Sequence, residues 1–376
     1  MKVIAALYFF LTLPGSISAQ LSSEIDSLGI TKDSSISLIW QKEIDSRVPI
    51  PLLVSREKIF ITAHNGNIFC FDLNGNLIWS YETGGTLISR PAVDNNVMAA
   101  GTIEGDLFSI DAVSGEVLQV IGLGEAVTSD LIIIDILKNG SKSKGVVLGT
   151  EKGNLYCYDL YTFELIWKNN SAGESILGKL LLIKNRIIFG SRDKYLYCID
   201  AKAGVINWKW KNSKLKETQE QNVNLNTCIP ASDEKLVYII GPQNKILSAI
   251  DLLLGTSVWQ KKDFKVSNSI GISQDGKKIF LPGAPGNFYI ISAAEGKLIK
   301  EIKMESGSEK SCTEPVEWNN NILSGSSSGK IYLIDSQFKW KTIISLDESI
   351  ISVNSIRANI FTALSSSGRI IVFKIY

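Results

Sequence analysis

The stretch GNLYCYDLYTFELIW, residues 153–167, decides the fold. It opens with a glycine suited to a tight hairpin, runs as a strand to Asp159, and returns as a second strand ending in Trp167. Versions of its first strand recur along the chain: NIFCFD (67–72), DLFSID (106–111), NLYCYD (154–159), YLYCID (195–200), ILSAID (246–251), NFYIIS (287–292), KIYLID (330–335) and RIIVFK (369–374). Their last residues lie 39 to 51 positions apart, so the chain is built from eight copies of one unit.

Each repeat contains a strand with two apolar faces. The residue just before the last position and the residue three further back are apolar in all eight copies. These positions lie on opposite faces, because side chains alternate along a strand, so the strand is buried on both sides. A second β run precedes it and a third follows it, and another opens each unit. Four antiparallel strands per repeat, without helical periodicity, predict a propeller blade.

The segment SLIWQKEI, residues 37–44, matches the Trp-bearing run of the repeat but has no strand-like run before it. The last repeat has the opposite deficit, because it ends at FKIY (373–376) after its third strand. An open ring would leave bare apolar faces and unpaired edges. We therefore expect an all-β fold: one eight-bladed propeller over residues 36–376, with four-stranded antiparallel blades. A strand at about residues 36–44 should complete the last blade.

The N-terminal residues have the composition of an export signal. Lys2 is followed by an apolar run over residues 3–13, then by Pro14, Gly15 and small residues up to Ala19. This predicts a signal peptide over residues 1–19 and a polar leader over residues 20–35. The run is short for a membrane span, and no later apolar run approaches about 18 residues. We expect an exported protein, periplasmic or extracellular, whose first cysteine, Cys70, is far from the cleavage site and so offers no lipid anchor.

The charge balance limits the classes of partner. The chain has 39 Lys and Arg against 38 Asp and Glu, and removal of residues 1–19 removes only Lys2 from this count. A neutral chain without a basic block gives no electrostatic basis for binding nucleic acid or anionic membranes. We expect a monomer that binds a protein partner.

Three stretches resemble a known repeat: GNLYCYDLYTFELIW (153–167), KYLYCIDAKAGVINW (194–208) and KILSAIDLLLGTSVW (245–259). They are similar to the repeat of quinoprotein alcohol dehydrogenases and their non-catalytic relatives. The enzyme branch implies pyrroloquinoline quinone (PQQ), calcium and a disulfide between adjacent cysteines, and this chain has no adjacent cysteines. In size and compactness the chain resembles the BamB-like branch, which carries no cofactor and works through protein contacts.

The resemblance therefore implies a non-catalytic, exported propeller that acts as a protein-binding scaffold in the cell envelope and holds no cofactor. Two alternatives stay open. One is a PQQ- and calcium-dependent quinoprotein dehydrogenase of reduced size. The other is a propeller that binds polysaccharide through aromatic side chains at the mouth of the funnel.

Several residue types suggest chemistry but fit structural roles better. The repeat aspartates end strands before turns, where a carboxylate accepts local backbone N–H bonds. Cys70, Cys157 and Cys198 share one repeat position that behaves as a small apolar core slot, while a bond between Cys228 and Cys312 stays open. His64 is the only histidine, and one histidine builds neither a His-rich metal site nor a triad. The repeat tryptophans are expected to pack between blades.

Two insertions interrupt the period, and both are predicted to be long surface loops. They are DILKNGSKSKG (135–145) and KWKNSKLKETQEQNVNLN (209–226). Binding residues are common on loops that a rigid scaffold presents. The candidate partner-binding residues are Lys138, Lys142, Lys144, Trp210, Lys214 and Lys216. No catalytic, metal-binding or cofactor-binding residue is predicted.

Overall fold

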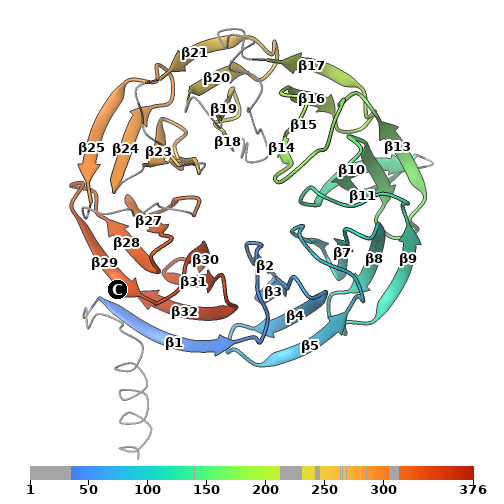
Figure 1. Cartoon of the computed structure of the whole chain (residues 1–376), viewed down its shortest axis with the longest axis horizontal. Coiled ribbons are helices and arrows are strands. Elements are labelled where there is room, and N and C mark those ends of the chain that lie inside the picture. Colours follow the sequence, from blue (N-terminus) through green and yellow to red (C-terminus); the bar gives the residue numbers. More distant parts are fainter. Residues whose placement is uncertain are drawn as a thin grey trace, which may run out of the picture.

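The computed structural model describes residues 35–138, 140–211, 231–241, 246–262, 264, 266–267, 269–283, 286–304 and 313–376. These residues form eight four-stranded antiparallel sheets arranged as the blades of a closed ring (Figure 1). The fold prediction is confirmed. In each blade the first strand is innermost and the fourth is outermost, and a blade is numbered here by its order from β2.

Blades 1 to 4 contain β2 (Leu53–Ser55), β3 (Lys58–Thr62), β4 (Asn67–Asp72), β5 (Leu77–Glu82); β6 (Ala92–Asp94), β7 (Val97–Gly101), β8 (Asp106–Asp111), β9 (Val117–Gly122); β10 (Ile132–Lys138), β11 (Ser141–Gly149), β12 (Leu155–Asp159), β13 (Leu165–Asn169); and β14 (Leu181–Ile183), β15 (Arg186–Gly190), β16 (Leu196–Asp200), β17 (Ile206–Trp210). Blades 5 to 8 contain β18 (Ala231–Ser232), β19 (Leu236–Ile240), β20 (Leu247–Asp251), β21 (Ser257–Lys261); β22 (Gly271–Ile272), β23 (Lys278–Pro282), β24 (Asn287–Ser292), β25 (Leu298–Lys303); β26 (Val316–Trp318), β27 (Asn321–Gly325), β28 (Lys330–Ile334), β29 (Trp340–Ser345); and β30 (Ile350–Arg357), β31 (Ile360–Ser365), β32 (Arg369–Ile375), β1 (Ile36–Glu43).

The N-terminal strand closes the ring, as the sequence predicts. Strand β1 pairs antiparallel with β32, from Ile36 opposite Ile375 to Glu43 opposite Arg369. Figure 1 shows β1 as the outer strand of the blade that otherwise contains only the C-terminal end of the chain. The first and last blades are thereby joined without an exposed apolar face.

The apolar side chains are buried between neighbouring blades. One cluster combines Phe60, Ile68 and Cys70 of blade 1 with Met98 and Phe108 of blade 2, and corresponding clusters lie at other junctions. The third strand of each blade contributes to the packing on both of its faces, which matches the double apolar pattern in the sequence. The ring is therefore held by repeated burial of apolar surface rather than by one central core.

Tryptophans on outer strands fasten each blade to the next one. The indole of Trp167 donates a hydrogen bond to the carbonyl of Ala201 at 3.1 Å, and it packs on Gly204. A Cβ on Gly204 would lie 2.5 Å from the ring, and the positive φ of 68° also favours glycine there. Five junctions share this donor, acceptor and glycine: Trp40, Leu73, Gly75; Trp79, Ala112, Gly115; Trp167, Ala201, Gly204; Trp208, Leu252, Gly255; and Trp259, Ala293, Gly296. The predicted packing between blades is confirmed for these rings.

Two junctions use a different aromatic residue. Gln119 and Lys300 occupy the tryptophan register position on β9 and β25. In the blades that follow, Phe163 and Phe338 replace the turn glycine, although their φ angles are 53° and 64°. Phe163 is buried in the core between blades 2 and 3, and Phe338 packs between blades 6 and 7. A ring from the following blade thus fills the space that the preceding blade leaves.

The repeat aspartates and cysteines have the structural roles that the sequence predicts. Asp159 Oδ1 accepts hydrogen bonds from the backbone N–H groups of Tyr161 and Thr162 at 3.0 and 2.9 Å. Asp72, Asp111, Asp200, Asp251 and Asp335 accept equivalent bonds in their own turns. Cys70, Cys157 and Cys198 are buried free thiols, and burial raises the pKa of Cys70 to about 11. Cys228 and Cys312 lie outside the described residues.

The prediction of a long loop over residues 135–145 is wrong. Strands β10 and β11 extend through it, and Lys138 pairs with Ser141 across the end of the hairpin. The physical reason is alternation: Ile134 and Ile136 turn inward and are buried, while Asp135 and Leu137 turn outward. The many polar residues of this stretch made its strand-like alternation of buried and exposed side chains hard to recognise in the sequence. Of the second insertion, Lys209 and Trp210 belong to β17, and residues 212–226 lie outside the described part of the chain.

Candidate functional site

The outer edge of blades 2 to 5 carries exposed apolar side chains. Because successive strands alternate in direction, the first and third turns of every blade lie on one face of the ring, which we call the Asp-turn face. Leu254 in the turn of blade 5 is 71% exposed, and Leu137 at the end of the β10–β11 hairpin is 66% exposed. We call the following set the apolar rim: Val113, Leu118, Val120, Leu137, Tyr161, Leu165, Val205, Ile206, Leu253, Leu254 and Val258.

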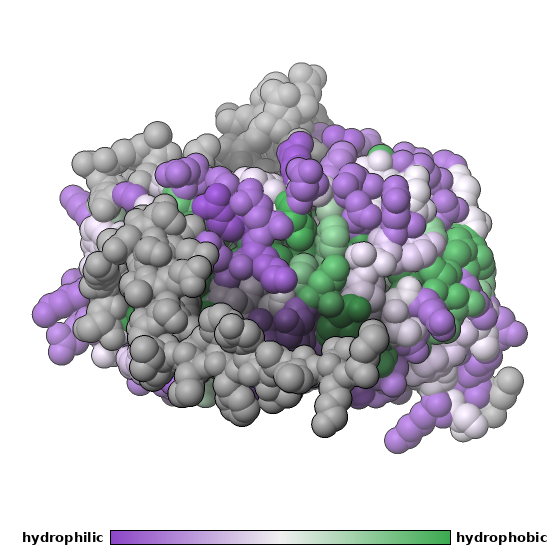
Figure 2. All heavy atoms as spheres, turned by 90° about the horizontal axis from the view of Figure 1, so that it is seen from below, coloured by the Kyte–Doolittle hydropathy of each residue, from purple (hydrophilic) through white to green (hydrophobic). Residues whose placement is uncertain are grey.

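The outer strands of other blades also expose apolar side chains, such as Leu77 and Ile78 on β5 and Leu298 and Ile299 on β25, so the feature that distinguishes the rim is its turns. The corresponding turns of blades 1, 4, 6 and 7 present Asn74, Lys202, Ala294 and Gln337 where blades 2, 3 and 5 present Val113, Tyr161 and Leu253. Figure 2 views the wall of the ring from the side on which β1 and β5 lie in Figure 1, and green apolar areas interrupt the purple surface there as well. Turns are normally polar, so the apolar residues in the turns of blades 2, 3 and 5 indicate a surface that contacts another molecule.

The three candidate lysines of the hairpin lie together beside this rim. Lys138 Nζ is 2.6 Å from Glu164 Oε2 and 3.6 Å from Asp159 Oδ2, so it fastens the hairpin to the turn of its own blade. Lys144 Nζ lies 2.7 Å from Asp135 and 3.9 Å from Asp94. The hydrogen bonds to Glu164 and Asp135 raise the pKa of Lys138 and Lys144, respectively.

Trp210 lies in the next blade and is half-buried. Its indole N–H donates to Ser257 Oγ at 2.9 Å, which links β17 to blade 5. Trp210 also packs on the apolar cluster between blades 4 and 5, together with Trp208. Lys214 and Lys216 lie outside the described residues. Lys142 is exposed and pairs across the hairpin with Leu137, so of the described candidates it is the one presented most directly to solvent.

Sequence reasoning missed the apolar side chains of the rim. The available signal was the composition of the turns that follow the repeat aspartates. DLLLG (251–255) places three leucines where DLNG (72–75) has one leucine and an asparagine. The charged insertions predicted the lysines beside the rim, whereas the leucines that form the rim were not predicted.

The central channel is lined by charged residues that pair with one another. Lys179 precedes β14 and Glu314 precedes β26, in blades on different sides of the ring (Figure 1), yet Lys179 Nζ is 3.0 Å from Glu314 Oε1. Arg90 and Asp130 lie at equivalent positions in blades 2 and 3, where the Arg90 backbone N–H donates to Asp130 Oδ1 at 3.0 Å. Burial raises the pKa of the Asp130 carboxyl, and the nearby Arg90 charge opposes this effect.

These channel residues do not fit a calcium-bound quinone. Calcium needs several carboxylate and amide oxygens around one point. In the part of the chain that the structure describes, no group of three or more His, Cys, Asp or Glu side chains lies close enough to hold a metal ion. Glu314 is instead engaged by Lys179 across the channel. No reaction step can be assigned to this channel from the residues present.

Comparison with known proteins supports the geometry. The profile of the family described as outer membrane protein assembly factor BamB matches residues 30–209 and 151–373. The chain belongs to this family. BamB from Shewanella oneidensis is 20% identical over 310 residues, which cover 78% of this chain and 72% of that protein. A second relative, the human beta-alanine-activating enzyme, is 26% identical over 114 residues, and the chain spans only 10% of its length.

Solved structures share the propeller fold. The crystal structure of BamB from Moraxella catarrhalis has a TM-score of 0.72 at 15% identity and covers 90% of this chain and 100% of that chain. A quinohemoprotein alcohol dehydrogenase from Pseudomonas putida HK5 has a TM-score of 0.67 at 12% identity, over 91% of this chain and 76% of the enzyme. At these identities the likenesses establish the fold alone. Within the described residues, no helix is long and apolar enough to cross a membrane.

Proposed function

We propose that the protein is a non-catalytic scaffold of the cell envelope that binds a protein partner through the apolar rim. The observation that carries the proposal is the presence of exposed apolar side chains in the turns of blades 2, 3 and 5, namely Val113, Tyr161, Leu253 and Leu254. Membership of the BamB family supports a role near outer-membrane assembly. The predicted signal peptide at residues 1–19 supports export from the cytoplasm.

The mode of binding follows from the shape of the rim. The turns and outer strands are held by paired sheets and by the tryptophan contacts, so the rim is presented without prior ordering. Apolar anchors supply the affinity of such a surface, and the neighbouring exposed Lys142 favours a partner with an acidic residue at its edge. Burial of each rim side chain would contribute about 1.5–3 kcal/mol, from which the entropy cost of association is subtracted.

Capture of envelope proteins by the purified full chain tests the proposal. We expect the double variant Leu253→Asp/Leu254→Asp to lose at least tenfold of the partner captured by wild type after mild crosslinking. Leu298→Asp/Ile299→Asp is the matched control, because these side chains on β25 are about half exposed but lie away from the rim. Equal capture by both variants would refute binding at the rim.

The alternative activities have direct tests. A quinoprotein dehydrogenase would show a bound-quinone spectrum and dye reduction when the chain is mixed with PQQ, calcium and an alcohol. We expect neither, since the described channel residues pair with each other. For a polysaccharide ligand, the only described aromatic side chains that are more than one-third exposed are Tyr161 and Tyr376, and both lie at the outer part of the ring.

A further inference from the structure

At the junction between blades 7 and 8 the outer strand supplies no tryptophan and the next turn supplies no phenylalanine; instead Trp318 of blade 7 meets Phe361 of blade 8 edge-to-face, with ring centroids 5.5 Å apart. Trp40, Trp79, Trp167, Trp208 and Trp259 fill five junctions, and Phe163 and Phe338 fill two. On β29 the register position opposite Leu333 is occupied by Lys341. Trp340, one residue earlier, turns back toward blade 6 and donates to the carbonyl of Lys303 at 3.0 Å.

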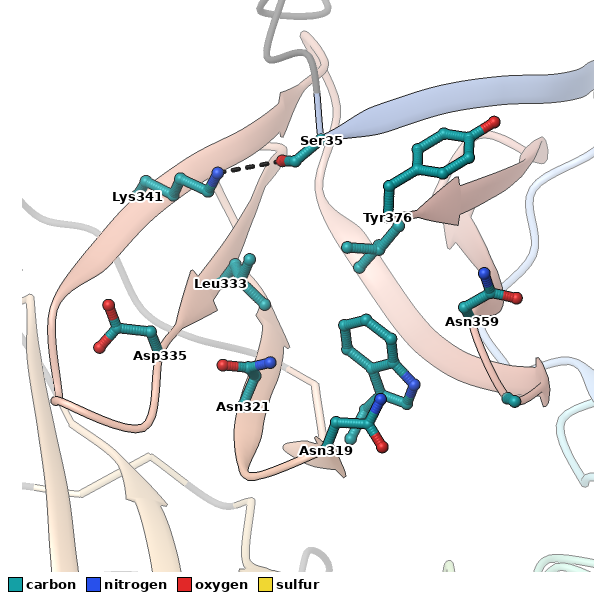
Figure 3. A pocket seen from close by; sticks show the side chains of 11 residues that line it. Ser35, Asn319, Asn321, Leu333, Asp335, Lys341, Asn359 and Tyr376 are labelled. Atoms are coloured by element: carbon teal, nitrogen blue, oxygen red, sulfur yellow. Dashed lines mark hydrogen bonds between the residues drawn. The ribbon is translucent and has the colours of Figure 1, made fainter.

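A cavity of about 730 Å³ lies at this junction, within the size range of small-ligand sites. We call it the seam slot. Figure 3 shows Leu333, Asn319 and Asn321 on the blade 7 side and Asn359 and Tyr376 on the blade 8 side. Lys341 Nζ donates to Ser35 Oγ at 3.0 Å above the slot (Figure 3). The slot therefore lies between the two blades, beside the start of the ring-closing strand.

The exposure of Leu333 shows that the missing ring leaves real space. The seven equivalent positions, Cys70, Ser109, Cys157, Cys198, Ala249, Ile290 and Val372, are at most 1% exposed, whereas Leu333 is 9% exposed. Ile375 corresponds to Ala112, since each donates its N–H to the first turn of its blade. The carbonyl of Ala112 accepts a hydrogen bond from the indole N–H of Trp79. The seam slot therefore contains Ile375, the residue at the position of this acceptor, but no tryptophan that donates to it.

The lining suits an aromatic group that also carries polar atoms. Leu333, Ile375 and the ring of Trp318 supply apolar surface, and the amides of Asn319, Asn321 and Asn359 supply donors and acceptors.

We propose that the seam slot binds an aromatic side chain, of the tryptophan type, from another polypeptide. The pseudo-symmetry of the ring defines the chemistry of the occupant, because the same space at other junctions holds an indole or phenyl ring. The stretch directly before Ser35, residues 20–34 (QLSSEIDSLGITKDS), contains no aromatic residue. The seam slot opens on the Asp-turn face, so it is accessible to an approaching protein.

The test uses the full chain and the probe N-acetyl-L-tryptophanamide, with N-acetyl-L-alaninamide for comparison, followed by calorimetry and ligand-observed NMR. We expect the tryptophan probe to bind at least tenfold more tightly than the alanine probe. Lys341→Trp should fill the slot from within, weaken probe binding at least tenfold and raise the Tm. Leu333→Gln, which removes part of the apolar lining, should also weaken binding and does not depend on the fit of a new ring.

Ser336→Trp adds the same side chain on an exposed turn outside the lining, and it should leave probe binding unchanged. Probe binding by Lys341→Trp equal to wild type, or equal binding of both probes, would overturn the proposal. Sedimentation identifies the source of the ring: a wild-type dimer that Lys341→Trp converts to monomer would assign the occupant to a second copy of this chain and refute another polypeptide. No rim residue takes part, so this test can fail while capture at the rim succeeds.

Discussion

At the residue scale, one carboxylate organises each turn of the Asp-turn face. Asp111 Oδ1 accepts the backbone N–H groups of Val113 and Ser114 at 2.7 and 2.8 Å. The bond from Ser114, then that from Val113, lowers the pKa of Asp111 from its usual 3.8. The same bonds fix the direction in which Val113 projects into solvent. The turn chemistry that the sequence predicts therefore also positions the rim.

Acid titration of Asp111→Asn tests this residue-scale role. A carboxyl with a lowered folded-state pKa stabilises the fold above its unfolded pKa, and this contribution disappears as the pH falls through the folded value. We expect the wild-type free energy of unfolding to fall more steeply than that of Asp111→Asn between about pH 5 and pH 2. Urea melts across this range provide the measurement.

The control for this titration is Glu116→Gln, which removes one negative charge from an exposed side chain near the same turn. Its pH profile should follow that of wild type. Parallel profiles for all three proteins would show that the ionisation of Asp111 contributes nothing to stability.

At the element scale, the outer strand of one blade and the turn of the next blade carry side chains of complementary size where a tryptophan or phenylalanine fills the junction. The outer strand of one blade supplies a tryptophan and the next turn supplies a glycine, or the strand supplies Gln119 and the turn supplies Phe163. Either pair fills the same volume. A φ above zero costs Phe163 conformational energy, which its burial between blades offsets.

Exchanging one pair for the other measures this complementarity. Phe163→Gly alone should lose about 3 kcal/mol or more by opening a cavity. Gln119→Trp alone should be destabilising by overpacking, at about 1–3 kcal/mol. The double variant should recover stability, with a favourable coupling of about 0.5–3 kcal/mol in chemical denaturation. Additive losses would mean that the two residues do not share one space.

The β10–β11 hairpin of blade 3 is the element whose secondary structure was not predicted from the sequence. The lysine-rich stretch 135–145 has the polar composition of a loop, although its residues alternate as in a strand. The same stretch places Ile134 and Ile136 inward, and the strands continue through it. Long-range pairs such as Lys144 with Asp94, and Lys138 with Glu164, depend on blade geometry and leave no local pattern in the sequence.

At the scale of the whole molecule, the repeat predicted nearly all of the architecture. Eight copies of one strand, together with SLIWQKEI at one end and FKIY at the other, were sufficient to predict eight blades and their closure. The sites were harder to predict, because they arise from departures from the repeat. Leu253 and Leu254 stand in a turn where other repeats have polar residues, and Lys341 stands where five other blades have tryptophan. Lys179 and Glu314 form an ion pair only because the closed ring brings their blades to face each other.

The most direct test of the central claim, that the apolar rim is the partner-binding surface, is site-specific photocrosslinking in the native envelope. A photoreactive phenylalanine analogue replaces Leu254 on the rim in one protein and Leu298 on β25 in another. The account predicts a discrete crosslinked product from position 254 and none from position 298. Crosslinks from position 298 alone, or equally from both positions, would contradict it.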